Sequence, residues 1–245
     1  MNTRLIMKTA LITGGAARIG AQIAKTLHSN NFKIIIHCNH SIEKAERLSD
    51  SLNSITSGSA EVISGDLNKI ENILSIVNSI DSLDLLVNNA SVFYPKTVED
   101  SELDDWNDVI NVNLRAPFFL SKGLSKKLTT NDGSIINIID IHADRPLKNH
   151  AVYNISKAGL KMMTQTLAKE LAPSIRVNGV SPGSILWPEA SAEISESEKK
   201  VMLERIALNR QGTPQDIADT VLFLANSDYI TGQIINIDGG RTLNQ

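Results

Sequence analysis

Short apolar runs alternate with longer amphipathic segments along the whole chain of 245 residues. After the first run, Ile19, Ile23, Ala24 and Leu27 recur at the spacing of one helix face. Strands that alternate with helices form parallel sheets covered on both faces, which is why such strands are almost wholly apolar. The pattern predicts a single α/β domain over residues 1–245, with a doubly wound parallel sheet of seven strands. The predicted strands are Thr9–Thr13, Lys33–His37, Glu61–Ser64, Leu85–Asn88, Ser134–Ile139, Ile175–Val180 and Gln233–Ile237.

Composition and charge exclude several classes of protein. The chain has 24 lysines and arginines against 27 aspartates and glutamates, and its net charge of −3 gives no general attraction to nucleic acid or an anionic membrane. The single cysteine cannot form an internal disulfide, so a reducing compartment is favoured and we expect a cytoplasmic protein. No apolar run approaches the roughly 18 residues of a membrane span, so no membrane partner is expected.

Residues 186–205 differ in character from the rest of the chain, because they are rich in Glu, Ser and Ala. They follow a turn signal, Ser181-Pro182-Gly183-Ser184, beyond the end of the sixth predicted strand. Ligands of doubly wound sheets bind at that end of the strands. We interpret the segment as a mobile lid over the site, with a solvated surface helix of no function as the alternative.

A glycine-rich turn connects the first predicted strand to the first predicted helix. Its sequence is Thr13-Gly14-Gly15-Ala16-Ala17-Arg18-Ile19-Gly20. Glycines let a phosphate approach the backbone, and the helix N-terminus offers free N–H groups and a partial positive charge. The turn therefore predicts a dinucleotide-binding site, in which Arg18 supplies a fork of donors beside the pyrophosphate.

The end of the second predicted strand indicates which dinucleotide binds. NAD sites usually carry a carboxylate there, which holds the ribose 2′-hydroxyl. This chain has His37-Cys38-Asn39-His40-Ser41 instead. Asn39, His40 and Ser41 can donate hydrogen bonds to a 2′-phosphate, so NADP is favoured over NAD. Ser41 as an ordinary helix cap is a compatible interpretation.

Tyr153 and Lys157 lie four residues apart at the start of a long helical pattern, which places both side chains on one helix face. A nearby ammonium favours the phenolate, so we expect Lys157 to lower the pKa of Tyr153 from about 10 toward neutrality. A tyrosine of that kind exchanges a proton at neutral pH while a hydride moves.

Together with Asn88-Asn89-Ala90, Asn111-Val112-Asn113 and Ile237-Asp238-Gly239-Gly240, these motifs resemble the short-chain dehydrogenase/reductase family over essentially the whole chain. The resemblance implies a Rossmann-type fold and a homotetramer. The chain departs from the family pattern at two positions. Arg18 replaces the usual middle glycine of the turn, and Asp140 replaces the usual serine thirteen residues before the tyrosine. Both departures, and the run Asn88–Pro95, are similar to the pteridine reductases of that family.

The resemblance implies a role for each matching residue. The catalytic residues are Asp140, Tyr153, Lys157 and Asn113, with Asn113 holding a water in a proton relay. Phe93 stacks on the pterin, Trp187 lies at the mouth of the pocket, and the full set of substrate-binding residues is Arg18, Ser91, Phe93, Asp140, Tyr153 and Trp187. The cofactor-binding residues are Gly14, Arg18, Ile19, Gly20, His37, Asn39, His40, Ser41, Asp66, Leu67, Asn89, Ala90, Ser91, Tyr153, Lys157, Pro182, Gly183, Ser184 and Ile185.

The predicted activity is therefore NADPH-dependent reduction of a dihydropterin to its tetrahydro form, with dihydrofolate or an oxidised pterin as related substrates. Two alternatives stay open. The first is a carbonyl reductase of the same family acting on 3-oxoacyl thioesters, against which Asp140 argues because a carboxylate repels a developing oxyanion. The second is a non-catalytic NADP-binding sensor, which has no need of a proton relay. The five histidines lack the spacing of metal ligands, so no metal is expected.

Overall fold

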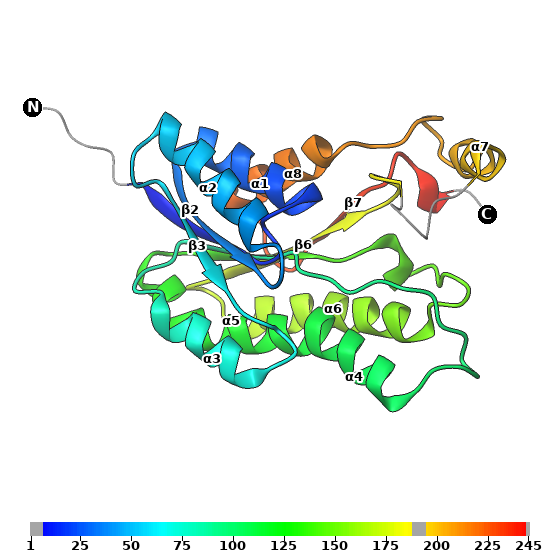
Figure 1. Cartoon of the computed structure of the whole chain (residues 1–245), viewed down its shortest axis with the longest axis horizontal. Coiled ribbons are helices and arrows are strands. Elements are labelled where there is room, and N and C mark those ends of the chain that lie inside the picture. Colours follow the sequence, from blue (N-terminus) through cyan, green and yellow to red (C-terminus); the bar gives the residue numbers. More distant parts are fainter. Residues whose placement is uncertain (1–6, 188–194, 244–245) are drawn as a thin grey trace, which may run out of the picture.

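The computed structural model describes residues 7–187 and 195–243, and its parallel sheet of seven strands confirms the predicted fold class. The strand order is β3-β2-β1-β4-β5-β6-β7 (Figure 1). Each predicted strand is present, with ends that differ by at most two residues from those expected. The strands are β1 (Lys8–Ile12), β2 (Phe32–Cys38), β3 (Ala60–Ser64), β4 (Leu85–Asn88), β5 (Ser134–Ile138), β6 (Arg176–Pro182) and β7 (Ile234–Ile237).

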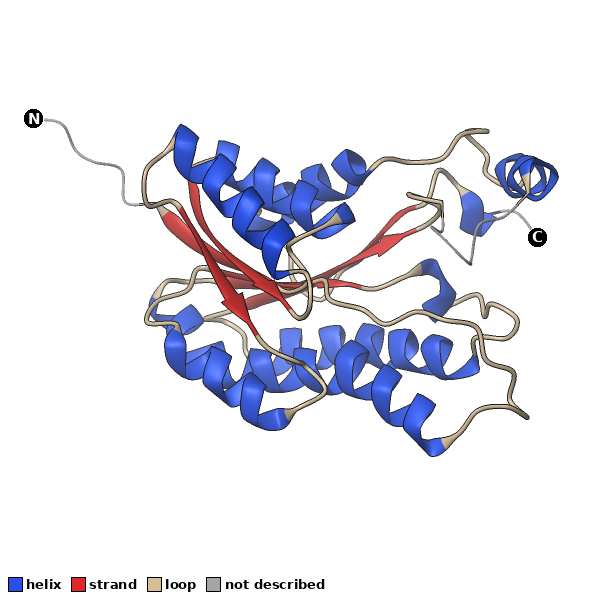
Figure 2. Ribbon diagram, viewed as in Figure 1, coloured by secondary structure: helices blue, strands red, loops and turns tan. Residues whose placement is uncertain are grey.

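Helices cover both faces of this sheet (Figure 2). Along β1, Ala10 and Ile12 belong to the apolar cluster beneath α1, α2 and α8, whereas Leu11 belongs to the cluster beneath α3, α5 and α6. The helices are α1 (Arg18–Ser29), α2 (Ile42–Ile55), α3 (Ile70–Ser79), α4 (Leu103–Ile110), the π-helical turn η1 (Asn111–Arg115), α5 (Ala116–Thr130), the 3-10 turn η2 (Ile141–Ala143), α6 (Ala151–Glu170), α7 (Glu196–Glu204), α8 (Pro214–Asn226) and the 3-10 turn η4 (Arg241–Leu243).

The chain order reverses between β1 and β4, which are neighbours in the sheet. The segment after β1 leads into α1 on one face, and the segment after β4 leads toward α4 and α5 on the other (Figure 1). Such a reversal leaves a crevice at the carboxyl ends of the strands, where doubly wound sheets bind their ligands. The glycine turn and the segment after Asn88 therefore meet at this crevice.

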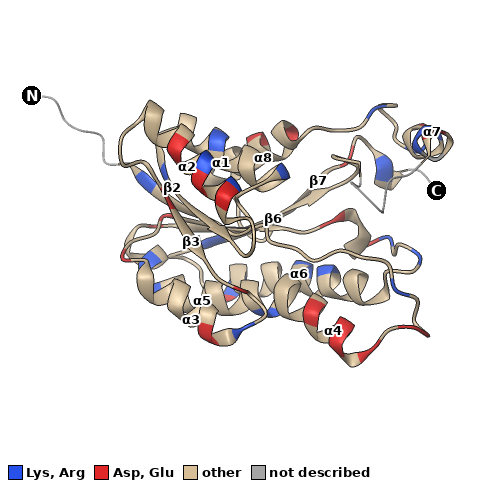
Figure 3. Cartoon of the chain, viewed as in Figure 1, with Lys and Arg blue, Asp and Glu red and all other residues tan. Residues whose placement is uncertain are grey.

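Charged side chains lie mainly on the helices and loops, where both signs are interspersed, and the central strands carry few of them (Figure 3). This distribution follows from the burial of the sheet on both faces. Within residues 7–187 and 195–243, no helix is both long and apolar enough to cross a membrane.

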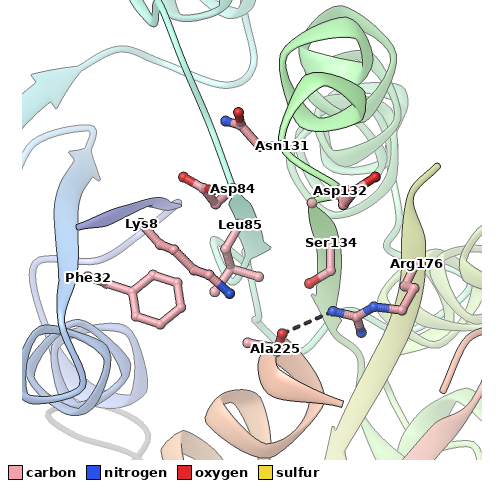
Figure 4. Close-up of a pocket in the computed structure, with 10 residues that line it drawn as sticks. Lys8, Phe32, Asp84, Leu85, Asn131, Asp132, Ser134, Arg176 and Ala225 are labelled. Atoms are coloured by element: carbon pink, nitrogen blue, oxygen red, sulfur yellow. Dashed lines mark hydrogen bonds between the residues drawn. The ribbon is translucent and has the colours of Figure 1, made fainter. Parts of the chain in front are cut away.

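The amino-terminal end of the sheet holds a small polar cavity of about 40 Å³ (Figure 4). Two of its charged side chains, Arg176 and Asp84, bond to backbone groups. Arg176 donates to the carbonyl oxygens of Leu224 and Ala225, at 2.8 and 2.9 Å, and so caps the last turn of α8. Asp84 accepts from the N–H of Thr9 at 2.7 Å. The contacts of Arg176 therefore attach the C-terminal end of α8 to this end of the sheet.

Replacing Arg176 by methionine should lower the free energy of unfolding by about 1–3 kcal/mol, because two carbonyl groups lose charge-assisted hydrogen bonds. Urea denaturation measures this loss. Lys33→Met is the control, since it removes an exposed ion pair with Glu61 that is worth at most about 1 kcal/mol. Equal destabilisation by the two variants would contradict the role given to Arg176.

Candidate active site

The turn between β1 and α1 has the shape that a dinucleotide pyrophosphate requires. Gly14 has a φ of +61°, and a side chain there would lie 3.0 Å from the Cα of Ala90. A side chain at Gly20 would collide with the carbonyl oxygen of Gly14. The N-cap of α1, Ala17, makes no side-chain cap, and the first turn of the helix contains no acidic residue. The N–H groups of this helix end are therefore suited to an anion, and the residues present fit NADPH.

Arg18 begins α1 with a φ of 51°, a left-handed conformation that favours glycine. An arginine retained at such a position indicates a use for its side chain. Its guanidinium reaches the segment after β6, where it donates to the carbonyl oxygen of Trp187 at 3.4 Å. The structure thus brings together two of the predicted substrate-binding residues, Arg18 and Trp187. Ile19 follows in the first turn of α1 and is half-buried.

The hydroxyl of Thr13 joins the ends of β1 and β4. Its oxygen accepts from the N–H groups of Asn89 and Ala90, at 2.9 and 3.0 Å. The Asn89 amide donates in return to the carbonyl oxygens of Thr13 and Gly14, at 2.9 and 3.1 Å. Asn89 and Ala90 are therefore placed beside the glycine turn. The importance of Thr13 was not predicted, although its position directly after a buried strand was a signal.

His37 lies behind the glycine turn rather than on its open side. The ring is 2% exposed, and both of its nitrogens contact backbone groups. One of them faces the N–H of Gly14 at 3.3 Å, and the other faces the carbonyl oxygen of Gly65 at 3.0 Å. The side chain is therefore occupied by protein contacts.

The segment after β2 is open to solvent. Asn39, His40 and Ser41 are exposed, and Ser41 is the N-cap of α2 without a side-chain cap bond. The predicted 2′-phosphate donors thus lie together on an exposed turn. After β3, Asp66 accepts from the N–H of Asn68 at 2.9 Å, and Leu67 is buried in the apolar cluster.

The segment after β6 closes the other side of the crevice. Gly183 donates its N–H to Ile237 at 2.9 Å, and a side chain at this position would lie 2.7 Å from the Cβ of Asp238. Ser184 accepts from Gln211 at 3.3 Å, and Ile185 belongs to the buried core. This packing fixes the chain from Pro182, the last residue of β6, to Ile185 against β7 and its flanking loops.

Tyr153 and Asp140 form a hydrogen-bonded pair. The tyrosine hydroxyl donates to one carboxylate oxygen at 2.8 Å, and the other oxygen accepts from the N–H of His142 at 2.8 Å. Burial and the negative charge of Asp140 raise the pKa of Tyr153 well above 10, although a hydrogen bond with Ser91 opposes them. The expectation that Lys157 lowers this pKa toward neutrality is therefore wrong for this arrangement. Tyr153 therefore holds its proton more tightly than a free tyrosine does.

Lys157 is 2% exposed and donates to the carbonyl oxygen of Ile138 at 3.1 Å. Its ammonium lies 5.6 Å from the centroid of the Tyr153 ring. Burial lowers the pKa of Lys157 to about 8, although the charge of Asp140 opposes the shift. The helix spacing thus places Tyr153 and Lys157 together, as predicted, but burial and the charge of Asp140 determine the pKa shifts of both side chains.

Asn113 lies in the π-helical turn between α4 and α5 and is fully buried. Its amide accepts from the N–H of Val92 at 2.8 Å, and donates to the carbonyl of Val92 at 3.0 Å and to Ser156 at 3.1 Å. All three of these contacts are internal to the protein, so the side chain holds the segment that carries Ser91 and Phe93. The predicted water-holding role is not tested by this arrangement of the side chain.

Phe93 presents an aromatic surface beside the Tyr153–Asp140 pair. Its side chain is 50% exposed, and its ring meets the Tyr153 ring edge-on, with centroids 4.8 Å apart. His150 stacks on Phe93 at 4.6 Å with an interplanar angle of 17°. This contact was not predicted, because His150 precedes the helix and carries no motif. Phe93 therefore has both a flat histidine neighbour and an exposed surface.

A second network joins the segments that follow β3 and β4. Asn68 donates to Asp108 at 2.6 Å, and Tyr94 donates to the other oxygen of Asp108 at 3.4 Å. Burial and the charges of Asp108 and Asp105 raise the pKa of Tyr94 to about 12. Nothing in the sequence motifs indicated this link between the segments after β3 and β4.

The predicted lid, residues 186–205, lies partly outside the described residues, because 188–194 are not among them. At its described ends, Lys199 of α7 lies 5.8 Å from the Trp187 ring centroid. Across 7–187 and 195–243, no group of three or more His, Cys, Asp or Glu residues is arranged to hold a metal ion.

Comparisons with known proteins agree with this geometry. The family described as enoyl-(acyl carrier protein) reductase matches residues 14–242. The 3-oxoacyl-[acyl-carrier-protein] reductase of Aquifex aeolicus is 35% identical over 98% of this chain and 99% of its own length. Proteins of the same name from Staphylococcus epidermidis and Rickettsia bellii are each 36% identical, over 95% and 96% of this chain and 98% and 97% of their own lengths. The chain therefore belongs to the short-chain dehydrogenase/reductase family, as its motifs predicted, and this membership supports an oxidoreductase that uses NADPH.

Proposed function

We propose that this reductase transfers a hydride from NADPH to a dihydropterin and delivers the matching proton through Tyr153. The observation that carries the proposal is the carboxylate of Asp140, which accepts the Tyr153 hydroxyl at 2.8 Å beside the exposed ring of Phe93. A pterin offers a flat heteroaromatic ring for Phe93 and N–H donors for a carboxylate.

The charge at the reacting atom favours a ring nitrogen over a ketone. Reduction of a ketone develops negative charge on oxygen, and Asp140 would raise the energy of that charge in a buried site. Reduction of a C=N bond instead leaves a nitrogen that takes up a proton. Asp140 therefore opposes the first reaction and is compatible with the second.

NADPH, when bound, supplies the hydride that is added to the ring carbon. Tyr153 supplies the proton to the adjacent ring nitrogen, so one hydride and one proton reduce the C=N bond. Asp140 holds the Tyr153 hydroxyl in place and, after the transfer, passes a proton taken up from solvent back to the tyrosine. Lys157, fixed by the carbonyl of Ile138, keeps a positive charge near the tyrosine ring and partly offsets Asp140.

A second candidate is the reduction of 3-oxoacyl thioesters. The names of the relatives favour this activity over pterin reduction. In that reaction Tyr153 would protonate the ketone oxygen, and Asp140 would have to lie turned away from it or be protonated.

The proposal includes a lid formed by residues 186–205 and a homotetrameric assembly. The contacts of Trp187 with Arg18 and Lys199 support a lid that is attached to the glycine turn. The exposed apolar side chains of Leu103, Trp106 and Phe118 on α4 and α5 support assembly through that helical face.

NADPH oxidation with dihydrobiopterin, dihydromonapterin, dihydrofolate and an acetoacetyl thioester decides between the two substrates. We expect turnover of at least one dihydropterin at a higher kcat/KM than the thioester, because the carboxylate disfavours the oxyanion. Turnover of the thioester alone would replace the pterin proposal with the second candidate.

Replacing Asp140 by serine should abolish pterin reduction and leave the Kd for NADPH nearly unchanged. The serine hydroxyl is too short and too weak an acceptor to hold Tyr153 in the same way. Steady-state kinetics and a fluorescence titration with NADPH measure the two effects. Asp144→Asn is the matched control, because this carboxylate lies in the same loop but pairs with Lys161 at the surface. Retained pterin reduction by the serine variant would refute the role of Asp140.

The buried ammonium of Lys157 predicts a dependence of stability on pH. Its pKa is about 8 in the folded chain and about 10.5 in the unfolded chain. Between these values the unfolded state binds more protons, so the contribution of Lys157 to stability rises from pH 8 to about pH 10.5. Across this window, the free energy of unfolding of the native chain should gain up to about 3 kcal/mol relative to Lys157→Met.

Urea denaturation of the cofactor-free protein at several pH values measures this gain. Lys161→Met, on the same helix but nearer the surface, should follow the native chain. If the free energies of unfolding of the native chain and Lys157→Met change in parallel from pH 8 to about pH 10.5, the lysine is not buried as an ammonium at neutral pH.

A further inference from the structure

The histidine behind the glycine turn has both ring nitrogens in use. The N–H of Gly14 can only donate, so the Nδ1 atom of His37 accepts from it at 3.3 Å. The carbonyl of Gly65 can only accept, so the Nε2 atom carries the hydrogen and donates at 3.0 Å. These two backbone partners select one neutral tautomer of the ring.

The backbone of the same residue holds the next position of the turn. The carbonyl oxygen of His37 accepts from the N–H of Gly15 at 2.9 Å. His37 therefore bonds to two consecutive N–H groups of the turn, one through its ring and one through its main chain. The next residue, Cys38, accepts from the N–H of Gly65 at 3.0 Å, so the segment after β3 is held from the same strand.

This arrangement sets the shape of the turn before any ligand arrives. Gly14 is left-handed, with a φ of +61°, and its amide is taken up by His37 instead of pointing to the crevice. A site that is ordered before the ligand arrives binds more tightly, because no free energy is lost to ordering the turn on binding. The ring also fixes the distance between the glycine turn and the segment that holds Asp66 and Leu67.

We propose that His37 is a positioning residue for NADPH, which acts by holding the glycine turn through Gly14 and not by touching the cofactor. The inference rests on NADPH as the cofactor but is independent of the substrate. Protonation of the ring would place a hydrogen on Nδ1, which would then face the N–H of Gly14. The doubly protonated ring is therefore incompatible with the turn as it stands.

Burial lowers the pKa of His37 from its ordinary value, and the hydrogen bond with Gly65 opposes the shift. The other charged or titratable groups on the adjoining segments include Arg18 at the start of α1, Lys33 and Cys38 on β2, His40 beyond β2, Glu43, Lys44, Glu46 and Arg47 on α2, and Asp66 after β3. A lowered pKa means that the folded protein favours the neutral ring, and that affinity for NADPH is lost only as the pH falls below the ordinary value of about 6.5.

Three substitutions separate the two ring contacts. Asparagine places an acceptor near the Nδ1 position, glutamine places a donor near the Nε2 position, and leucine supplies neither. His37→Asn should therefore keep the Kd for NADPH close to that of the native chain at pH 7. His37→Gln and His37→Leu should each raise it about tenfold, which corresponds to one lost hydrogen bond of about 1.4 kcal/mol.

Fluorescence titration with NADPH, from pH 5 to pH 8 and without substrate, measures these affinities. The native chain should bind more weakly as the pH falls from 6.5 to 5, beyond any change seen in His37→Asn, because the asparagine does not titrate. Thermal unfolding at each pH identifies the range in which each protein is folded. At a pH where a variant is unfolded, the change in the NADPH affinity of the native chain is the test.

His28→Gln is the matched control. His28 is also a buried histidine, and it bonds to Ser59 at 2.7 Å near the opposite end of the sheet. This variant should lose thermal stability without a change in the Kd for NADPH. Equal binding by the asparagine and glutamine variants, or equal weakening by His28→Gln, would overturn the proposal. If the native chain bound NADPH at no pH, the assignment of NADPH as the cofactor would be wrong, and the inference about His37 would be wrong with it.

Discussion

Burial of the sheet on both faces is the constraint on which the rest of this structure depends. A strand such as β1, with Leu11 in one apolar cluster and Ala10 and Ile12 in the other, has no surface left for polar chemistry. Polar groups must therefore gather at the strand ends, and the carboxyl ends of β1 and β4 are where the chain order reverses. The hydroxyl of Thr13 closes this junction by accepting two N–H groups from the neighbouring strand end. The glycine turn and the segment that begins with Asn89 and Ala90 are both placed relative to that junction.

The site combines three charged or polar groups that burial alone would disfavour. Asp140 accepts two hydrogen bonds, Lys157 donates to Ile138, and Tyr153 lies between them. Burial keeps the tyrosine protonated and lowers the pKa of the lysine. A serine in place of Asp140 would remove the nearby negative charge and leave the lysine as the dominant charge. Burial first, and the carboxylate of Asp140 second, thus reverse the direction of the Tyr153 pKa that the motif Tyr-x-x-x-Lys implies on its own.

The sequence allowed prediction of what depends on period and spacing. The strands follow from their apolar runs, the turn from its glycines, and the shared face of Tyr153 and Lys157 from their separation along a helix. Features that depend on where a side chain turns were not predictable in this way. His37 points back under the turn, Asn113 bonds to Val92, and His150 stacks on Phe93, and each outcome is decided by packing between distant segments. The predicted direction of the Tyr153 pKa was wrong for the same reason, because burial of the ring and the charge of Asp140 outweigh the effect of Lys157.

Similarity over the whole chain and specificity for a substrate come from different residues. Relatives at 35–36% identity cover almost the whole chain, so this similarity extends over the fold as a whole. Substrate choice depends on the few groups that meet the reacting atoms, and a fold alone does not determine it. In the function proposed above, those groups are Asp140, Phe93 and Arg18. A carboxylate beside Tyr153 and an arginine that contacts Trp187 would change the charge that a substrate meets, without disturbing the sheet that positions it. In the proposed reaction the hydride goes to a ring carbon and Tyr153 protonates the adjacent nitrogen, whereas in the alternative the hydride goes to a carbonyl carbon. The negative charge of Asp140 favours the first of these reactions.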